Sequence, residues 1–274
     1  MIEQRYVKKR KKRKLVAFIS SFATIGMAAL ILVAFLGRHT GSFTVSLNTG
    51  DVKISLGNKM SFADDEGSSY LKVDKLAAFD ESTYLAILEE GEGVLDSEES
   101  PYTLGYDEDA KTMNFFKYTF FVKNLGAKTA DYELSIKIKE STPSVNGQYL
   151  DNELRVMFYA NDGYNTDSHN REVYALRSES PNTDLNGDKT FDEYISMSPM
   201  LAQEKGVEFP GFAKQFESEK VVATIPVKYF DRSDMNRYTI VTWLEGYDPQ
   251  SDGREAPEGA SIKLGVEINA YENK

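Results

Sequence analysis

The sequence predicts a mainly β domain, an antiparallel β-sandwich or jelly roll with short helical insertions, preceded by one transmembrane helix. Two observations predict the sandwich. Several segments alternate apolar and polar residues with a period of two, and turn residues separate them where an α/β protein would have amphipathic helices. A third, an uncharged apolar run near the N-terminus, predicts the helix. We therefore divide the chain into a basic cytoplasmic tail at 1–14, a transmembrane helix at 15–37 and an extracellular β-sandwich domain at 38–274.

The apolar run from Leu15 to Leu36 is long enough to cross a bilayer as a helix. It holds no charged side chain, and at about 1.5 Å per residue it spans a hydrocarbon core of roughly 30 Å. Lys and Arg residues cluster before the run, whereas only Arg38 and His39 follow it, which orients the N-terminus towards the cytoplasm. The basic tail is also expected to attract anionic lipid. A cleaved signal peptide is the alternative, but its apolar core is usually only about 7–15 residues long.

Charge and cysteine content restrict the partners of the outer domain. Residues 38–274 carry 24 Lys and Arg against 42 Asp and Glu, a net charge of −18. This acidity excludes nucleic acid as an expected partner and favours cations or basic surfaces, although solubility alone also explains it. The chain has no cysteine, which excludes disulfides and thiolate metal sites and favours an exported protein of a Gram-positive bacterium.

Eight segments have the alternation of half-buried strands. They are residues 43–47, 52–56, 116–122, 132–138, 154–158, 221–227, 238–243 and 262–268. We expect the turn at 48–51 to join the first two as a hairpin, and the strand at 132–138 to pair with the one before it. In the segment 238–243, Tyr238 and Ile240 share one face while Val241 and Trp243 lie on the other.

Two insertions interrupt this pattern. The first insertion begins with residues 74–90, which have apolar side chains at helical spacing and are predicted to form one or two short helices capping an end of the sandwich. Residues 89–109 are acidic and rich in turn residues, so we expect a solvated loop, with a cation-binding surface as the alternative. The second insertion, residues 161–216, contains the most specific local motif in the chain.

That motif, residues 182–193, fits the spacing of an EF-hand-type calcium loop, with Gly187 at the sharp turn. The candidate oxygen ligands of the metal are Asn182, Asp184, Asn186, the backbone carbonyl of Asp188, and Glu193. Three features depart from the pattern, namely Asn182 in the place of Asp, Lys189 in the place of an aliphatic residue, and no predicted helix before the loop. The segment 191–195 after the loop is compatible with a helix, which would make the motif half of an EF-hand, whereas the alternative is a plain turn. Calcium is the one cofactor that the sequence suggests.

The sequence contains no recognisable catalytic constellation. Its two histidines, His39 and His169, lie at the membrane exit and in a polar segment, and no serine elbow, zinc-binding helix or phosphate-binding glycine loop is present. Acid pairs such as Glu245 and Asp248 serve in glycosidases, but acidic residues are too numerous here for that pair to be specific. We therefore predict no catalytic residues and no enzymatic activity.

Four pieces of the outer domain resemble a known group of proteins. They are residues 41–45, 122–126, 238–249 and 262–270. Together they are similar to exported β-sandwich surface proteins of Gram-positive bacteria, of the biofilm-fibre and camelysin type. The resemblance implies a jelly-roll fold and a role at the cell surface or in the matrix. The expected anchor and the absence of an evident leader-cleavage site depart from the released, fibre-forming members of that group.

These observations favour a membrane-anchored cell-surface protein whose non-catalytic sandwich binds or assembles with a protein or polymer of the envelope or matrix. One alternative, a sensor or regulatory ectodomain, is disfavoured because a 14-residue tail is too short for a signalling domain. Another, a wall-directed hydrolase, is disfavoured because the sequence shows no nucleophile or metal motif. Trp243, the only tryptophan, is expected in the core and not on a ligand-stacking platform.

Overall fold

The chain divides into two units, residues 1–39 and 40–274. The computed structural model describes residues 41–49, 52–59, 67–76, 81–88, 102–107, 112–161, 171–176, 187, 193–248 and 259–273. All of these belong to the second unit, and within them no helix has the length and apolar character that crossing a membrane requires. The predicted transmembrane helix at 15–37 lies outside the described residues.

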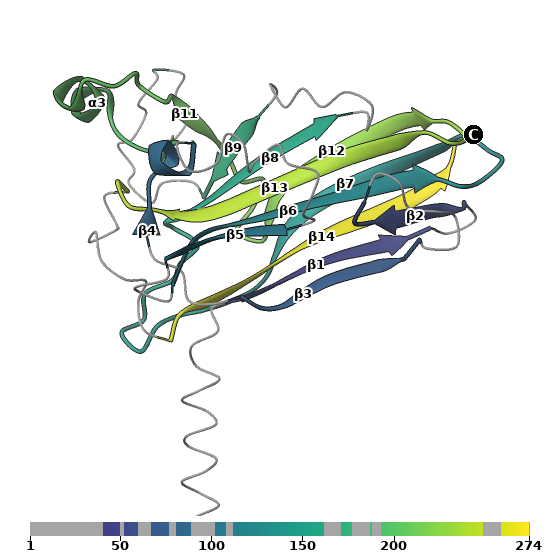
Figure 1. Ribbon diagram of the computed structural model, residues 1–274, viewed down its shortest axis with the longest axis horizontal. Coiled ribbons are helices and arrows are strands. Elements are labelled where there is room, and N and C mark those ends of the chain that lie inside the picture. Colours follow the sequence, from purple (N-terminus) through teal and green to yellow (C-terminus); the bar gives the residue numbers. More distant parts are fainter. Residues whose placement is uncertain are drawn as a thin grey trace, which may run out of the picture. The chain divides into compact units, whose positions relative to one another are not determined.

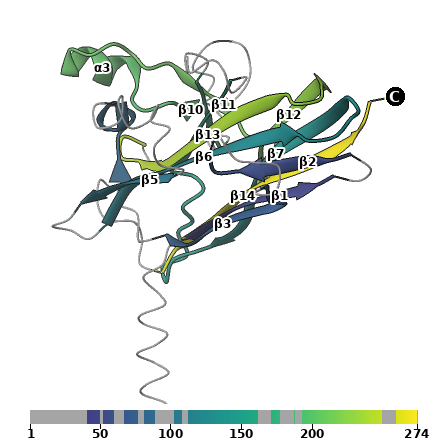
Figure 2. The same cartoon turned by 45° about the vertical axis from the view of Figure 1, so that its right-hand side comes forward.

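The described part of the second unit is mainly β and consists of two packed sheets (Figures 1 and 2). The first sheet has the order β12-β7-β14-β1-β3, where the strands are Val221–Phe230, Ala130–Thr142, Ser261–Glu272, Gly41–Asn48 and Tyr70–Leu76. The second has the order β10-β11-β9-β8-β13-β6-β2, where the strands are Glu193–Tyr194, Phe212–Gln215, Glu172–Ala175, Leu154–Asn161, Met235–Glu245, Thr112–Asn124 and Ile54–Gly57. Two further strands, β4 (Glu81–Ser82) and β5 (Tyr102–Asp107), pair with β13 and β6. The prediction of a sandwich is thereby confirmed.

The sheets are mixed, which differs from the antiparallel arrangement that the sequence predicted. Most neighbours are antiparallel, but β1 runs parallel to β14 over eight paired residues, from Gly41 opposite Ile262 to Asn48 opposite Asn269. The pairs β9 with β11 and β4 with β13 are also parallel. Alternation along a strand sets which side chains share a face, but it carries no information on the direction of the neighbouring strand.

Two predicted pairings are wrong, namely the hairpin joined by 48–51 and the pairing of 132–138 with the strand before it. In both cases the chain passes from one sheet to the other between the two strands. The segment after β1 crosses to the other sheet, so that β1 pairs with β14 and β3 while β2 pairs with β6. Likewise β6 and β7 follow one another in the chain but lie in different sheets. Both connections are turns between facing sheets and not hairpins within one sheet. The turn residues at 48–51 and 124–129 are compatible both with a hairpin within one sheet and with a turn between two sheets.

The main core lies between the two sheets and is built from the alternating faces of the predicted strands. In β6 the inward side chains are Phe116, Tyr118, Phe120 and Val122, all at most 2% exposed. A hydrogen bond between the hydroxyls of Tyr132 in β7 and Tyr238 in β13 joins the sheets across this core. Side-chain alternation, which is local, predicted this core correctly.

The outer face of the second sheet carries a second apolar cluster. Trp243 lies at its centre, fully buried, together with Phe115, Met157 and Val241. Ile87 also packs there, from the helical residues 84–88, whose first turn is capped by Thr83. The predicted burial of Trp243 is confirmed, but Trp243 lies in this outer cluster and not in the main core with Phe120 and Ile240. The prediction of a short helix within 74–90 is also confirmed. However, the helix covers a sheet face, and Leu76 belongs to β3.

Several elements lie where no strand was predicted. The acidic segment 89–109, expected to be a solvated loop, contains β5 at Tyr102–Asp107. The second insertion contributes β9, β10, β11 and the helix α3 (Pro199–Lys205), which Ser198 caps at the N-terminus and Gly206 ends with a φ of 69°. These pieces are two to seven residues long, too short for a period to be read from them.

Candidate functional site

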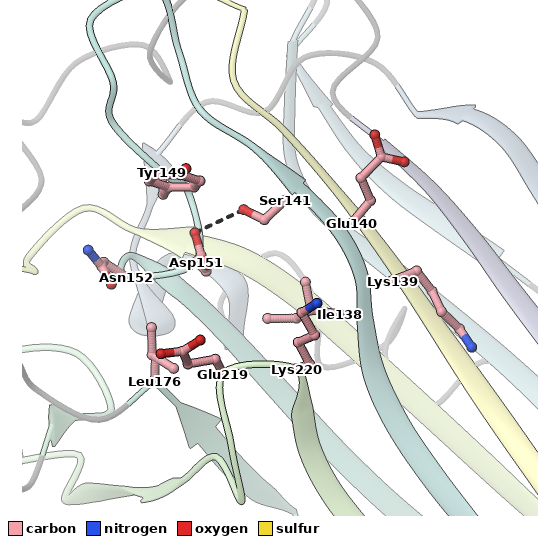
Figure 3. Close-up of a pocket in the computed structure, with 10 residues that line it drawn as sticks. All are labelled: Ile138, Lys139, Glu140, Ser141, Tyr149, Asp151, Asn152, Leu176, Glu219 and Lys220. Carbon is pink, nitrogen blue, oxygen red and sulfur yellow. Dashed lines mark hydrogen bonds between the residues drawn. The ribbon is translucent and has the colours of Figure 1, made fainter.

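A hollow of about 510 Å³ opens between the end of β7, the loop that follows β7, and the turn before β12 (Figure 3). Its lining residues are Ile138, Lys139, Glu140, Ser141, Tyr149, Asp151, Asn152, Leu176, Glu219 and Lys220. This volume lies within the roughly 300–1,000 Å³ of typical ligand sites. The hollow therefore has the size of a binding site, and its chemistry follows from three layers of side chains.

The floor of the hollow is apolar, its wall is polar and its rim is aromatic. Ile138, which is 4% exposed, and the half-buried Leu176 form the floor. Asp151 and Asn152 stand on one side at intermediate exposure, and Tyr149 lies at the rim with 48% of its surface exposed (Figure 3). A ligand with one apolar face and a hydroxyl-bearing edge would find a partner for each surface.

Two other lining residues belong chiefly to the neighbouring sheet surface. Lys139 forms an ion pair with Glu267 of β14, and Glu140 forms one with Lys263 of the same strand. In Figure 3 both side chains point away from the group formed by Tyr149 and Asp151. The charged groups left to face the hollow are Asp151, Glu219 and Lys220, which give it a small excess of negative charge.

The loop that carries Tyr149 is held by the buried Ser144, which is 7% exposed. The Ser144 hydroxyl accepts hydrogen bonds from the backbone N–H groups of Asn146 and Gln148, at 3.2 and 3.0 Å. Its backbone N–H donates to the Gln148 carbonyl at 2.7 Å, and Leu150, directly after Tyr149, is fully buried. The tyrosine is thus presented on a fixed turn, so that little conformational entropy is lost when a ligand packs on it.

The opposite wall is also a side-chain-stabilised turn. The Ser218 hydroxyl accepts a hydrogen bond from the backbone N–H of Val221 at 3.1 Å, and the two residues exchange backbone hydrogen bonds. Glu217 reaches forward to Thr224, accepting from its backbone N–H and its hydroxyl, both at 2.7 Å. Glu219 and Lys220 occupy the two positions between Ser218 and Val221, so their backbone is fixed as well.

The fully buried Arg155 holds the end of the loop at Asn152 in place. Its guanidinium donates to the backbone carbonyls of Asn152 and Tyr194, at 3.3 and 3.1 Å, and to the Asp248 carboxylate at 2.8 Å. On the side of the hollow itself, the Ser141 hydroxyl donates to Asp151 at 3.0 Å. The polar wall is therefore supported both by its neighbour and by a buried ion pair.

Glu245, beside this ion pair, is fully buried and is an acceptor in four hydrogen bonds. Oε2 accepts from the Trp243 indole at 2.9 Å and from the Tyr84 backbone at 3.1 Å, while Oε1 accepts from the Ser196 hydroxyl and the Tyr247 backbone, at 2.9 and 3.2 Å. Burial raises the pKa of Glu245, and these donors together with Arg155 partly oppose the rise because they favour the charged carboxylate. Such a carboxylate links β13 to three neighbouring segments.

The predicted calcium loop falls largely outside the described residues, which include only Gly187 and Glu193 of the motif. Gly187 has a φ of 82°, the left-handed conformation that a sharp turn requires. Glu193 begins the strand β10, so the helix considered for 191–195 is not formed at its described residues 193–195. Its Oε2 lies 3.9 Å from the Arg155 guanidinium. Asn182, Asp184, Asn186 and Asp188 lie in the part of the chain that is not described.

The acid pair considered for hydrolysis, Glu245 and Asp248, is buried, with exposures of 0% and 2%. Both carboxylates make the structural hydrogen bonds given above, so neither faces the hollow. His39 and His169 lie outside the described residues. Within the described ranges, no three His, Asp or Glu side chains come together as a metal site would require.

Sequence reasoning missed the hollow and the buried Arg155. The signal for the arginine was present in β8, where Leu154, Val156 and Phe158 face one side while Arg155 and Met157 face the other. A strand that is apolar on both faces is buried on both, so a charge within it indicates a buried ion pair. The signal for the rim was Tyr149, an isolated aromatic residue following the turn sequence Asn146-Gly147. No known family model matches this chain, and no curated protein matches it either.

Proposed function

We propose that this chain is a membrane-anchored cell-surface protein whose sandwich binds a polymer of the envelope or matrix in the hollow beside Tyr149. The observation that carries the proposal is the hollow itself, in which an exposed tyrosine and polar side chains stand on two fixed turns over an apolar floor. Sites preorganised in this way are typical of binding surfaces. The anchor at 15–37 and the tail at 1–14 provide the attachment to membrane lipid, and the jelly roll implied by the resemblance belongs to the same proposal.

The binding test uses the full chain in lipid nanodiscs, mixed with the insoluble envelope and matrix material of the host. Co-sedimentation is expected to saturate with the protein, and Tyr149→Ala is expected to weaken it. Tyr70→Ala is the matched control, because Tyr70 is 50% exposed and lies on β3, outside the hollow. No co-sedimentation of the wild-type chain, or equal loss in both variants, would refute the assignment of binding to the hollow.

The location is tested separately on intact, wall-stripped cells. External protease is expected to remove residues 38–274 and to leave the membrane-bound N-terminal piece. A domain protected from the protease would contradict the proposed orientation. A mature protein that starts near Arg38 would instead show that the apolar segment is cleaved and does not anchor the chain.

A further inference from the structure

We propose that the ligand of the hollow is an uncharged saccharide chain, an assignment that rests on the proposed binding function. The first argument is the match of surfaces. A sugar ring presents C–H groups on its faces and hydroxyl groups around its edge. Ile138, Leu176 and Tyr149 offer apolar and aromatic contact to a ring face. Asp151 and Asn152 offer hydrogen-bonding groups to the ring edge.

The second argument is charge. Asp151 and Glu219 are acidic, and Lys220 is the one base that faces them among the lining residues, since Lys139 pairs with Glu267. The surrounding domain carries a net charge of −18. A phosphate-bearing or carboxylate-bearing polymer would be repelled at this site. The balance of charges therefore favours a ligand recognised through hydroxyl groups and ring faces.

The third argument distinguishes a saccharide from a peptide. Extended peptides are commonly bound by addition to a free sheet edge, where main-chain groups supply the hydrogen bonds. The hollow lies between two turns in which the backbone N–H groups of Asn146, Gln148 and Val221 are already bonded to the hydroxyls of Ser144 and Ser218. Among the lining side chains, the amide of Asn152 suits hydroxyl groups and the ring of Tyr149 suits C–H faces.

The test measures binding of soluble probes to the full chain in nanodiscs by calorimetry. The probes are oligosaccharides of glucose and of N-acetylglucosamine, a poly(glycerol phosphate) and an unstructured peptide. At least one uncharged oligosaccharide is expected to bind saturably. Tyr149→Ala and Asn152→Ala are each expected to weaken that binding by roughly tenfold, whereas Tyr70→Ala leaves it unchanged.

A charge variant separates an uncharged sugar from an amine-bearing ligand. Glu219→Gln keeps the shape of the wall and removes one charge, so the affinity for an uncharged oligosaccharide is expected to stay within about twofold and to be insensitive to salt. A large loss in Glu219→Gln together with strong salt dependence would overturn the assignment in favour of a cationic ligand.

The remaining outcomes separate the two proposals. Binding of the peptide or the phosphate polymer in preference to every oligosaccharide would overturn the saccharide assignment. If envelope material still co-sediments in a Tyr149-dependent manner, the proposed binding function stands while the saccharide assignment falls. If neither envelope material nor any probe binds, both proposals fall. Melting temperatures of the variants equal to that of the wild type confirm that a lost interaction is local.

Discussion

The indole nitrogen of Trp243 donates a 2.9 Å hydrogen bond to Oε2 of Glu245, two residues further along the same strand. Both side chains are fully buried on the outer face of the second sheet, where Tyr84 stacks on the indole with ring centroids 5.9 Å apart. Because Trp243 is the only tryptophan in the chain, its fluorescence reports on the ionisation of Glu245.

Acidification is therefore expected to change the emission of Trp243 with a midpoint above about 4.3, the usual pKa of a glutamate. The reason is that burial raises the pKa of Glu245. At neutral pH the emission should be blue-shifted and poorly quenched by iodide. The Glu245→Gln variant is the control and should show no such transition. A midpoint at or below that of a solvated glutamate would contradict the prediction.

The raised pKa of Glu245 also predicts how this residue affects the stability of the domain as the pH changes. Since its pKa is raised on folding, the folded state binds the proton more tightly than the unfolded state. The contribution of Glu245 to the free energy of unfolding should then fall as the pH rises from the pKa of a solvated glutamate, about 4.3, through the raised pKa of folded Glu245. Urea unfolding of the wild type and of Glu245→Gln across this pH window measures the difference.

Removing the partner of the buried arginine is expected to destabilise the domain strongly. Asp248→Asn removes the carboxylate 2.8 Å from the Arg155 guanidinium, and losing one partner of a buried ion pair typically costs about 3–5 kcal/mol. Glu193, 3.9 Å from the guanidinium, remains and is expected to offset part of this cost. As the control, Glu267→Gln breaks ion pairs of Lys137 and Lys139 on the partly exposed sheet face and should cost less than about 1 kcal/mol. Equal losses in denaturant unfolding would contradict the distinction.

Tyr229 is predicted to tolerate glycine better than alanine. It has a φ of 56° at a bulge in β12, its side chain is 73% exposed, and its backbone N–H donates to Asp131 at 3.0 Å. A left-handed conformation costs an ordinary L-residue roughly 1–2 kcal/mol, and glycine avoids this cost. Tyr229→Gly should thus be about 1 kcal/mol more stable than Tyr229→Ala. At a regular strand position the order is reversed, as Thr224→Gly and Thr224→Ala would show.

The calcium interpretation of residues 182–193 predicts that millimolar calcium raises the melting temperature of the full chain relative to chelator. At ten times the dissociation constant the gain is about 1.4 kcal/mol. Asp184→Asn is the better test variant, because Glu193 also lies near Arg155 and its replacement would disturb that ion pair. Identical melting curves in calcium and in chelator would contradict the calcium interpretation and favour a plain turn at residues 182–193.

Local patterns in the sequence predicted the long strands and the residues that fill the core, but not how the strands pair. Phe116, Tyr118 and Phe120 alternate along β6, so the buried face could be read directly. The partner of β1 is β14, more than 200 residues away in the sequence, so no local pattern indicates it. A turn between sheets also contains the same types of residue as a hairpin turn, so the turn does not show which sheet the next strand joins. The hollow was equally inaccessible, because Glu219 comes beside Ser141 and Asp151 only through the register of β12 against β7.

The parallel pairing of β1 with β14 has a consequence for how the protein is made. β14 lies between β7 and β1 in the first sheet, yet among the described strands it is the last to leave the ribosome. Until Ser261–Glu272 has been synthesised, β7 and β1 each keep one edge uncovered, and such edges are prone to pair with other chains. The sheet therefore closes in one late step, and a chain that stops short of β14 remains open at its centre for proteases to remove.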